Sequence, residues 1–556
     1  MPLNKELDEK LLKMRREAEE RDAQRRADQL KYPYLDLRTA PINIEALSLV
    51  SQEEAEAAKL AILEKKQNNL TIAVYDPLLP ETKKTIDTLI AKGYHLSFFI
   101  SSLSGLKVIW GFYRFVPKPK EKITGQIRLE KARLNELRKS LTSLENIKRA
   151  LEKVGADSIY TAQVLEIVLA GSLSNRASDI HFEPKENKVR LRIRIDGLLY
   201  DVWENLSHNA YNSILSRIKL LSGLKINIHD EPQDGRFSVS LPEKTIEIRT
   251  SIMPSEFGEA IVLRLLDPET IKLSIKDLGF REDDLKIIEK ELTRPNGAIL
   301  NTGPTGSGKT TTLYSFLSHV QTPETKIITI EDPIEYHLEG IEQTQVDPEA
   351  GYTFATGLRS ALRQDPDVIL IGEIRDLETA EIAMHSALTG HLVFSTLHTN
   401  DASGAIPRLL DLGVKPQIVA PALNIIIAQR LVRRLCEACK EPVEISPELK
   451  ERVEKFLDKL PDKVNKDSFK NFKIFKPKGC NQCNYLGYKG RIAIFEMLMV
   501  TDKMKDLISR EPIETEIKKL AIEEGMVTLA QDGIMKVLRG ITTPEEVERV
   551  AGVLDW

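Results

Sequence analysis

The sequence has few of the features that mark a secreted or membrane-spanning protein. Its 556 residues include only four cysteines, too few for a disulfide scaffold in a chain of this length. No N-terminal apolar run resembles a signal peptide, and the most apolar segment, residues 95–112, is interrupted by serine, glycine and lysine. A membrane span needs about 20 predominantly apolar residues. We therefore expect a soluble, cytoplasmic protein.

The chain also lacks a strong net charge. It has 79 Lys and Arg residues against 83 Asp and Glu residues, which gives a formal net charge of −4. A global positive field for nucleic acid is therefore absent, although a local basic patch is not excluded. The length and the apolar fraction of 42% are consistent with three or four domains.

Changes in pattern along the chain predict five parts. They are a charged helical or disordered arm (1–31), a small globular module (32–116), a linker with an amphipathic helix (117–155), an α+β domain (156–275) and a C-terminal α/β domain (276–556).

The linker is expected to hold one long amphipathic helix. Its leucines lie close to a heptad seam, in which Lys148 occupies one position: Leu134, Leu137, Leu141, Leu144 and Leu151. Packing against the neighbouring domain of the same chain is the simpler interpretation, and a coiled coil that joins subunits is the alternative.

The α+β domain has strands rich in arginine. Residues 189–195 alternate at period two with arginines on one face, and Asp196-Gly197 predicts a tight turn. Arg192, Arg194, Arg249 and Arg264 lie on predicted strands. One interpretation is that these arginines are solvated or form salt bridges at the surface. The other is that they neutralise transition-state charge at a nucleotide site in a neighbouring domain, and the pattern alone does not separate the two.

From about residue 297, short apolar strands alternate with helices, as in a parallel α/β sheet. The first strand leads into a complete G-x-x-x-x-G-K-[ST] phosphate-binding loop. Its residues, with the threonine that follows, are Gly303, Pro304, Thr305, Gly306, Ser307, Gly308, Lys309, Thr310 and Thr311. The glycines let backbone N–H groups surround phosphate oxygens, Lys309 would reach the β/γ-phosphates, and the Thr310 hydroxyl would bind Mg²⁺. The loop predicts ATP and Mg²⁺ as ligands.

Two later strands end in carboxylates. Residues 368–371 lead to Glu373, at the position where such sites hold an acid near Mg²⁺. Glu331 begins an acidic segment after another strand, where a carboxylate could orient or deprotonate water. A solvated acidic turn is an equal alternative for that segment.

Histidines stand at both ends of a further strand. His391 and His398 bracket residues 392–395, where a γ-phosphate sensor could sit. Metal binding by this pair is not favoured, because no third ligand stands nearby in the sequence.

The four cysteines form two C-x-x-C pairs. Cys436, Cys439, Cys480 and Cys483 predict a closed, structural Cys₄ zinc site with a long excursion between the pairs, within a module of residues 436–483. A redox pair or incidental thiols are the alternatives.

These motifs together resemble the type II secretion and type IV pilus assembly ATPases of the secretion ATPase superfamily. The resemblance spans about residues 150–556. It rests on seven segments: Arg176–Pro184, Arg194–Gly197, the phosphate loop, Ile330–Glu335, Leu362–Asp376, Gly390–His398 and Gln429–Cys436, the last of which leads into the zinc module. It implies a multidomain α/β fold in which a PAS-like α+β domain (N2) precedes a RecA-like P-loop ATPase domain with a Cys₄ zinc module.

The resemblance also implies roles. Glu331 would position or activate water, Glu373 would hold Mg²⁺, and His391 and His398 would sense the γ-phosphate. Arg194, Arg249 and Arg264 lie in the stretches from which the family draws its nucleotide-contacting arginines. The expected assembly is a homohexamer that drives an inner-membrane platform protein and adds pilin subunits to a filament.

Residues 33–116 resemble the family's small N-terminal domain (N1). Some members bind cyclic di-GMP there through an Arg-Leu-Gly-type motif, whereas this chain has the charged segment 11–29 in that place. We therefore expect residues 1–116 to dock a membrane partner, such as a cytoplasmic component of the membrane ring.

Three other functions compete with filament assembly. Retraction ATPases generally lack the cysteine module and the long N-terminal region. A DNA-uptake or nucleic-acid translocating motor is disfavoured by the near-neutral charge and by the lack of an aromatic-basic stripe. A non-hydrolysing scaffold is disfavoured by intact Lys309, Glu331 and Glu373. The motifs do not separate pilus assembly from type II secretion.

Overall fold

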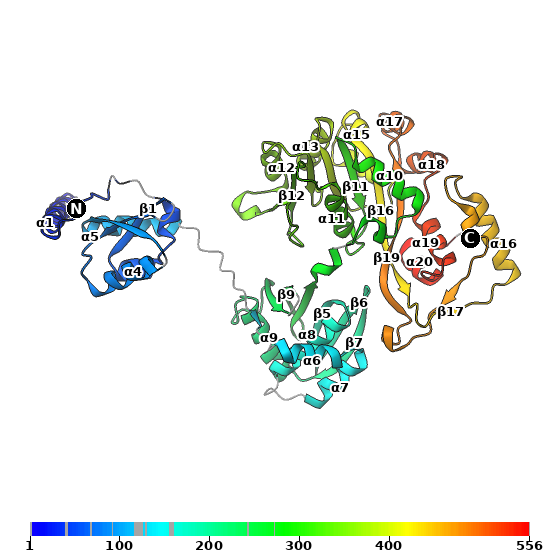
Figure 1. Cartoon of the computed structure of the whole chain (residues 1–556), viewed down its shortest axis with the longest axis horizontal. Coiled ribbons are helices and arrows are strands. Elements are labelled where there is room, and N and C mark those ends of the chain that lie inside the picture. The colour runs from blue at the N-terminus through cyan, green and yellow to red at the C-terminus, as the bar shows by residue number, and fades with distance from the viewer. Residues whose placement is uncertain are drawn as a thin grey trace. The chain divides into compact units, whose positions relative to one another are not determined.

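The computed structural model divides into two compact units, Met1–Lys122 and Ile123–Trp556 (Figure 1). The structure describes residues 3–38, 40, 43–66, 69–91, 93–115, 126–127, 131–154, 161–241, 244–271 and 273–554. The predicted linker at 117–121 lies outside the described residues. In the part of the chain that is described, no helix is both long and apolar enough to cross a bilayer.

The N-terminal unit is built on a three-stranded sheet of order β1-β2-β3. Its strands are β1 (Leu60–Lys66), β2 (Asn69–Val74) and β3 (His95–Ile100). Its helices are α1 (Leu3–Leu30), α2 (Ile44–Leu47), α3 (Gln52–Ala57), α4 (Pro80–Ala91) and α5 (Leu103–Trp110). The charged arm is helical, and its second half docks on the module: Ala23 and Ala27 are buried, and the Arg26 guanidinium lies 3.6 Å from the centre of the Tyr75 ring.

Near the start of the second unit, two helices lie where the leucine pattern predicted one. They are α6 (Lys131–Ser140) and α7 (Leu144–Val154). The single long helix was wrong because Ser143 starts a new helix, its hydroxyl accepting a hydrogen bond from the Asn146 backbone N–H at 3.1 Å. Leu141 and Leu151 are buried in the core of the domain that follows, so packing within the chain accounts for the seam.

That α+β domain carries a seven-stranded sheet of order β4-β8-β9-β10-β5-β6-β7. Its strands are β4 (Gln126–Ile127), β5 (Ala177–Pro184), β6 (Val189–Ile195), β7 (Leu198–Leu206), β8 (Gln233–Ser240), β9 (Thr245–Ser255) and β10 (Gly258–Leu266). Helices α8 (Thr161–Ser174) and α9 (His208–Leu221) pack on this sheet together with α7 and complete its core. In β6 the apolar side chains are buried and the alternate arginines are partly exposed, as the period-two pattern predicted.

The C-terminal domain has a second seven-stranded sheet, of order β13-β12-β14-β15-β11-β16-β19, parallel except between β16 and β19. Its strands are β11 (Gly297–Thr302), β12 (Ile327–Glu331), β13 (Glu342–Gln345), β14 (Val368–Ile371), β15 (Leu392–Leu397), β16 (Leu423–Leu435) and β19 (Tyr488–Met499). The helices up to β16 are α10 (Glu282–Leu292), α11 (Lys309–Val320), α12 (Phe354–Leu362), α13 (Leu377–Leu388), α14 (Ala405–Asp411) and α15 (Pro416–Ala422). Ala298 and Leu300 of β11 enter one core and Ile299 enters the other, so both faces of the sheet are covered.

The remaining strands and helices of the C-terminal domain lie after β16 in the sequence. They are β17 (Glu441–Pro442), α16 (Pro447–Lys459), β18 (Phe475–Lys476), α17 (Asp502–Ile508), α18 (Glu514–Glu523), α19 (Leu529–Leu538) and α20 (Pro544–Ala551). Val453 and Phe456 of α16 are buried in the core, so the excursion between the cysteine pairs packs on the domain.

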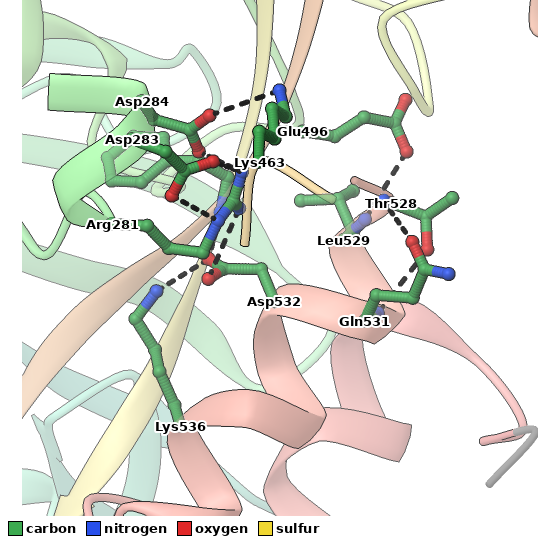
Figure 2. A network of polar contacts seen from close by, with 11 residues as sticks. Arg281, Asp283, Asp284, Lys463, Glu496, Thr528, Leu529, Gln531, Asp532 and Lys536 are labelled. Carbon is green, nitrogen blue, oxygen red and sulfur yellow. Dashed lines mark hydrogen bonds and ion pairs between the residues drawn. The ribbon is translucent and has the colours of Figure 1, made fainter. Parts of the chain in front are cut away.

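A buried ionic network joins α10, the excursion and α19 (Figure 2). Arg281 forms ion pairs with Asp283 at 3.2 Å, with Asp284 and with Asp532 at 3.5 Å. Lys536 contacts Asp532 at 2.5 Å. Lys463 adds a contact of 3.9 Å to Asp284. Arg281, Lys536, Asp284 and Asp532 are buried, whereas Lys463 is exposed at the margin of the network.

Candidate functional site

The phosphate loop lies at the carboxyl edge of the parallel sheet. It follows β11, and α11 begins at Lys309. Gly306 and Gly308 have φ values of 79° and 92°, which side-chain-bearing residues rarely adopt. A Cβ on Gly303 would lie 2.6 Å from the Gln429 carbonyl oxygen, so this residue must be glycine for the loop to pack on β16. The expected strand–loop–helix context is therefore present.

The Lys309 side chain turns back over the loop. Its Nζ donates to the Gly303 carbonyl at 2.7 Å and to the Pro304 carbonyl at 3.2 Å. Burial lowers the pKa of Lys309 to about 8, Glu373 opposes this shift, and Arg430 adds to it. Lys309 has no carboxylate within ion-pair distance among the described residues. Its charge is thus held by neutral carbonyl groups at the point where phosphates would bind.

Glu331 ends β12 and is buried, with 3% of its surface exposed. Its carboxylate accepts hydrogen bonds from the Tyr314 hydroxyl, from the Thr329 hydroxyl at 2.5 Å and from the Gln343 amide at 3.1 Å. Burial, reinforced by the Glu331 charge, raises the pKa of Tyr314 strongly. Glu331 is therefore held by Tyr314 of the phosphate-loop helix and by Gln343 of the edge strand β13. The solvated acidic turn does not describe this residue.

Glu373 and His398 meet at the same edge of the sheet. The Glu373 carboxylate forms an ion pair with Arg375 and lies 3.4 Å from His398 Nε2. Glu373 also acts electrostatically on Lys309. The structure thus brings together Lys309, Glu373 and His398 around the loop.

His391 lies at the other edge. Strands β11 and β15 run parallel with Gly297 opposite Leu392 and Thr302 opposite Leu397. His391 therefore precedes β15 at the amino edge, where its Nδ1 lies 3.1 Å from the Ser386 carbonyl oxygen. Within one chain a strand's length separates His391 from His398, and only His398 lies beside Glu373. The γ-phosphate role of His391 stays a prediction.

The arginines of the α+β domain form a row across its sheet. The strand registers place Arg236 opposite Arg249, Arg249 opposite Arg264, and Asp179 between Arg264 and Arg194. Asp179 pairs with Arg264 at 2.9 Å and with Arg194 at 3.4 Å.

Arg249 reaches the C-terminal domain from this row. It donates to the Ile334 carbonyl at 2.6 Å and lies 3.5 Å from the Glu335 carboxylate. The contact joins the N2 sheet to the acidic segment that follows β12. Arg236 was missed from the sequence, although it shares the same face.

The four cysteines converge, as predicted. Their Sγ atoms all lie within 4.8 Å of one another. Three of the separations are 3.9 Å (Cys436–Cys480), 3.8 Å (Cys439–Cys483) and 3.8 Å (Cys480–Cys483). Tetrahedral zinc with Zn–S bonds of about 2.3 Å requires Sγ separations of about 3.8 Å. The donor set therefore fits zinc, and its closed geometry fits a structural site.

Comparisons with known proteins identify the family of the chain. The family model described as "Type II/IV secretion system protein" matches residues 155–549. The chain belongs to this family. A second model, the MshEN domain, matches residues 30–104. Because the family and its relatives are ATPases, the chain is an ATP-hydrolysing P-loop enzyme.

Relatives come from both branches of the family. The type IV pilus assembly ATPase PilB of Myxococcus xanthus is 39% identical over 519 residues, covering 93% of this chain and 88% of the relative. The type II secretion system protein E of Dickeya dadantii is 43% identical over 396 residues, covering 71% and 76%. The structure of the Yersinia pseudotuberculosis ATPase DotB is similar in fold, with a TM-score of 0.50 and 22% identity over 70% of this chain and 92% of that one.

Proposed function

We propose that the chain is the subunit of a hexameric motor that uses ATP to assemble a type IV pilus or a type II secretion pseudopilus. The single observation that carries this proposal is the contact of Arg249 with the segment after Glu331. Through it, a change at the nucleotide site would alter the contact between the two domains. Relatives named for pilus assembly and for type II secretion support filament assembly as the work that ATP hydrolysis drives.

In this proposal each site residue has one task. Lys309 and the loop N–H groups bind the phosphates. Thr310 and Glu373 would hold Mg²⁺, which would supply positive charge to the phosphate oxygens. Glu331 orients the attacking water after nucleotide binding loosens its bonds to Thr329 and Gln343. His398 senses the γ-phosphate beside Glu373. Arg249, Arg264 and Arg194 of the arginine row contact the phosphates of the nucleotide during one step of the hydrolysis cycle.

The zinc module fixes the strands that meet the N2 domain. Asp196 accepts a hydrogen bond from the Gly490 backbone N–H at 2.8 Å, and Arg433 donates to the Tyr200 hydroxyl at 3.3 Å. Cys436 directly follows β16, and Cys483 lies just before β19. If zinc is the bound ion, the purified protein contains about one zinc per chain, and Cys480→Ser loses the metal and makes residues 440–479 sensitive to protease. Retention of protease resistance without metal would exclude a structural zinc.

The partner is an inner-membrane platform protein, reached from the cytoplasmic face, and residues 1–116 dock a component of the membrane ring. Phosphate release is measured with full-length protein and Mg-ATP, alone, with the platform protein's cytoplasmic domain, and with DNA. We expect stimulation by the platform domain and none by DNA, with Lys309→Ala as the background. Stimulation by DNA alone would instead support the DNA-uptake motor.

A further inference from the structure

Arg430 lies beside the phosphate loop, in the segment Gln429–Cys436 that leads into the zinc module, and the sequence alone predicts no role for it. It belongs to β16, whose Ala428 pairs with Thr302, the last residue of β11. Arg430 therefore lies beside the first residues of the phosphate loop. A Cβ on Gly303 would come within 2.9 Å of Arg430 Nη1.

The Arg430 guanidinium is buried without a carboxylate partner. The residue is 9% exposed, and its Nη1 and Nη2 donate to the carbonyl oxygens of Gln429 at 3.0 Å and Asn400 at 2.5 Å. Among the described residues no carboxylate lies within 4.0 Å of it. A buried arginine is ordinarily paired with a carboxylate. This one adds positive charge next to Lys309, which the more distant charges of Glu496 and Asp401 offset in part.

The hydrogen bond from Arg430 to the Asn400 carbonyl also holds the loop that carries His398, because His398 lies only two residues before Asn400. The same loop is tied to β11 by the Thr399 backbone N–H, which donates to the Thr302 hydroxyl at 2.9 Å, and by a contact of 2.7 Å between the two threonine hydroxyls. Arg430 therefore connects the loop that carries His398 to the mouth of the phosphate loop. The two loops are thus joined both by the Arg430 side chain and by the contacts between Thr302 and Thr399.

We propose that Arg430 is a positioning residue for ATP, which holds the His398 loop against the phosphate loop and adds the second positive charge that attracts the phosphates. The ligand class is a nucleoside di- or triphosphate. The inference rests on ATP hydrolysis at this loop and not on the filament that the motor builds, so it can fail while the proposed function stands.

The test uses full-length Arg430→Met and Arg430→Lys. Arg434→Met serves as the matched control, because Arg434 is an exposed arginine of the same strand, β16. Affinity is measured with a fluorescent ADP analogue, and kcat and KM are measured with Mg-ATP. We expect Arg430→Met to weaken ADP binding about tenfold and to lower kcat by tenfold or more. Lysine keeps the charge but cannot span both carbonyls, so Arg430→Lys should restore ADP affinity to within about threefold while kcat stays low.

Equal defects in Arg430→Lys and Arg430→Met would contradict the role of charge, and wild-type kcat in both would contradict positioning. If Arg430→Met fails to fold, Thr399→Val provides a second test, because it removes the hydroxyl contact between Thr399 and Thr302 that also holds the His398 loop. It should lower kcat several-fold with ADP affinity unchanged. Unchanged kcat in Thr399→Val would also overturn the proposal.

Discussion

Two groups of cations in the C-terminal domain differ in what neutralises them. In the ionic network, Arg281 and Lys536 contact the carboxylates of Asp284 and Asp532 (Figure 2). Beside the phosphate loop, Lys309 and Arg430 donate to backbone carbonyl oxygens and to no carboxylate of the described part of the chain.

The difference separates structure from function on physical grounds. A cation paired with carboxylates in the interior is already neutralised, and removing its partner leaves an uncompensated buried charge. A cation held by carbonyls retains a favourable interaction to make with an anion. The first group therefore stabilises the fold, whereas the second is arranged for a ligand that brings negative charge, as ATP does.

The largest effect should come from breaking the balanced network. Asp532→Asn removes the charge that faces Arg281 and Lys536 and should lower the free energy of unfolding by about 3–5 kcal/mol, because both cations stay buried. Urea unfolding checks this, with Asp502→Asn as the exposed control, expected to change stability by less than about 0.5 kcal/mol. A loss for Asp532→Asn no larger than that of the control would contradict the structural role.

Removing a positive charge beside the phosphate loop should lower ATP hydrolysis and leave the stability of the fold unchanged. Lys309→Met is expected to reduce hydrolysis by at least about a hundredfold, since the methionine cannot stabilise phosphate charge. The unfolding midpoint of the nucleotide-free protein should stay at the wild-type value, because no carboxylate is left unpaired. A large drop in that midpoint would show that Lys309 also stabilises the fold.

The network itself should respond to pH through Asp284. Burial raises the pKa of Asp284 to about 6, against a partial opposing effect of Arg281. The folded state therefore binds this proton more tightly than the unfolded state, and its contribution to stability is lost as pH rises through about 6. Relative to Asp284→Asn, the wild type should lose on the order of 2 kcal/mol between pH 4 and pH 7 in urea unfolding. A constant difference across this range would contradict the raised pKa.

The smallest effect should come from Tyr314. Tyr314→Phe removes one of the hydrogen bonds that hold Glu331 and should change kcat by several-fold, equivalent to about 1 kcal/mol, with little change in ADP affinity. Steady-state kinetics check this, with Tyr352→Phe as the control, because Tyr352 bonds Thr344 instead. Unchanged kcat in Tyr314→Phe would show that the hydroxyl does not set the position of Glu331.

The sequence was informative wherever a motif is local. The phosphate loop needs only glycines and one lysine in order, and the period of β6 alone places its arginines on one face. The two C-x-x-C pairs likewise predicted a cluster that the fold closes. The fold class and family resemblance were confirmed by the comparisons.

The sequence failed where contacts depend on strand order. His391 and His398 look equivalent as a motif, yet a strand places them at opposite edges. Arg430 reaches the loop only because β16 lies next to β11 in space. Gln343 supports Glu331 from an edge strand that was not predicted. No pattern in the chain encodes these neighbours.

The most direct measurement is the binding of a fluorescent ADP analogue to the wild type, Lys309→Met and Asp532→Asn under conditions in which all three are folded. Wild type and Asp532→Asn should bind with the same affinity, and Lys309→Met should bind at least about tenfold more weakly. Wild-type affinity in Lys309→Met, or lost affinity in a folded Asp532→Asn, would contradict the assignment of the two groups of cations.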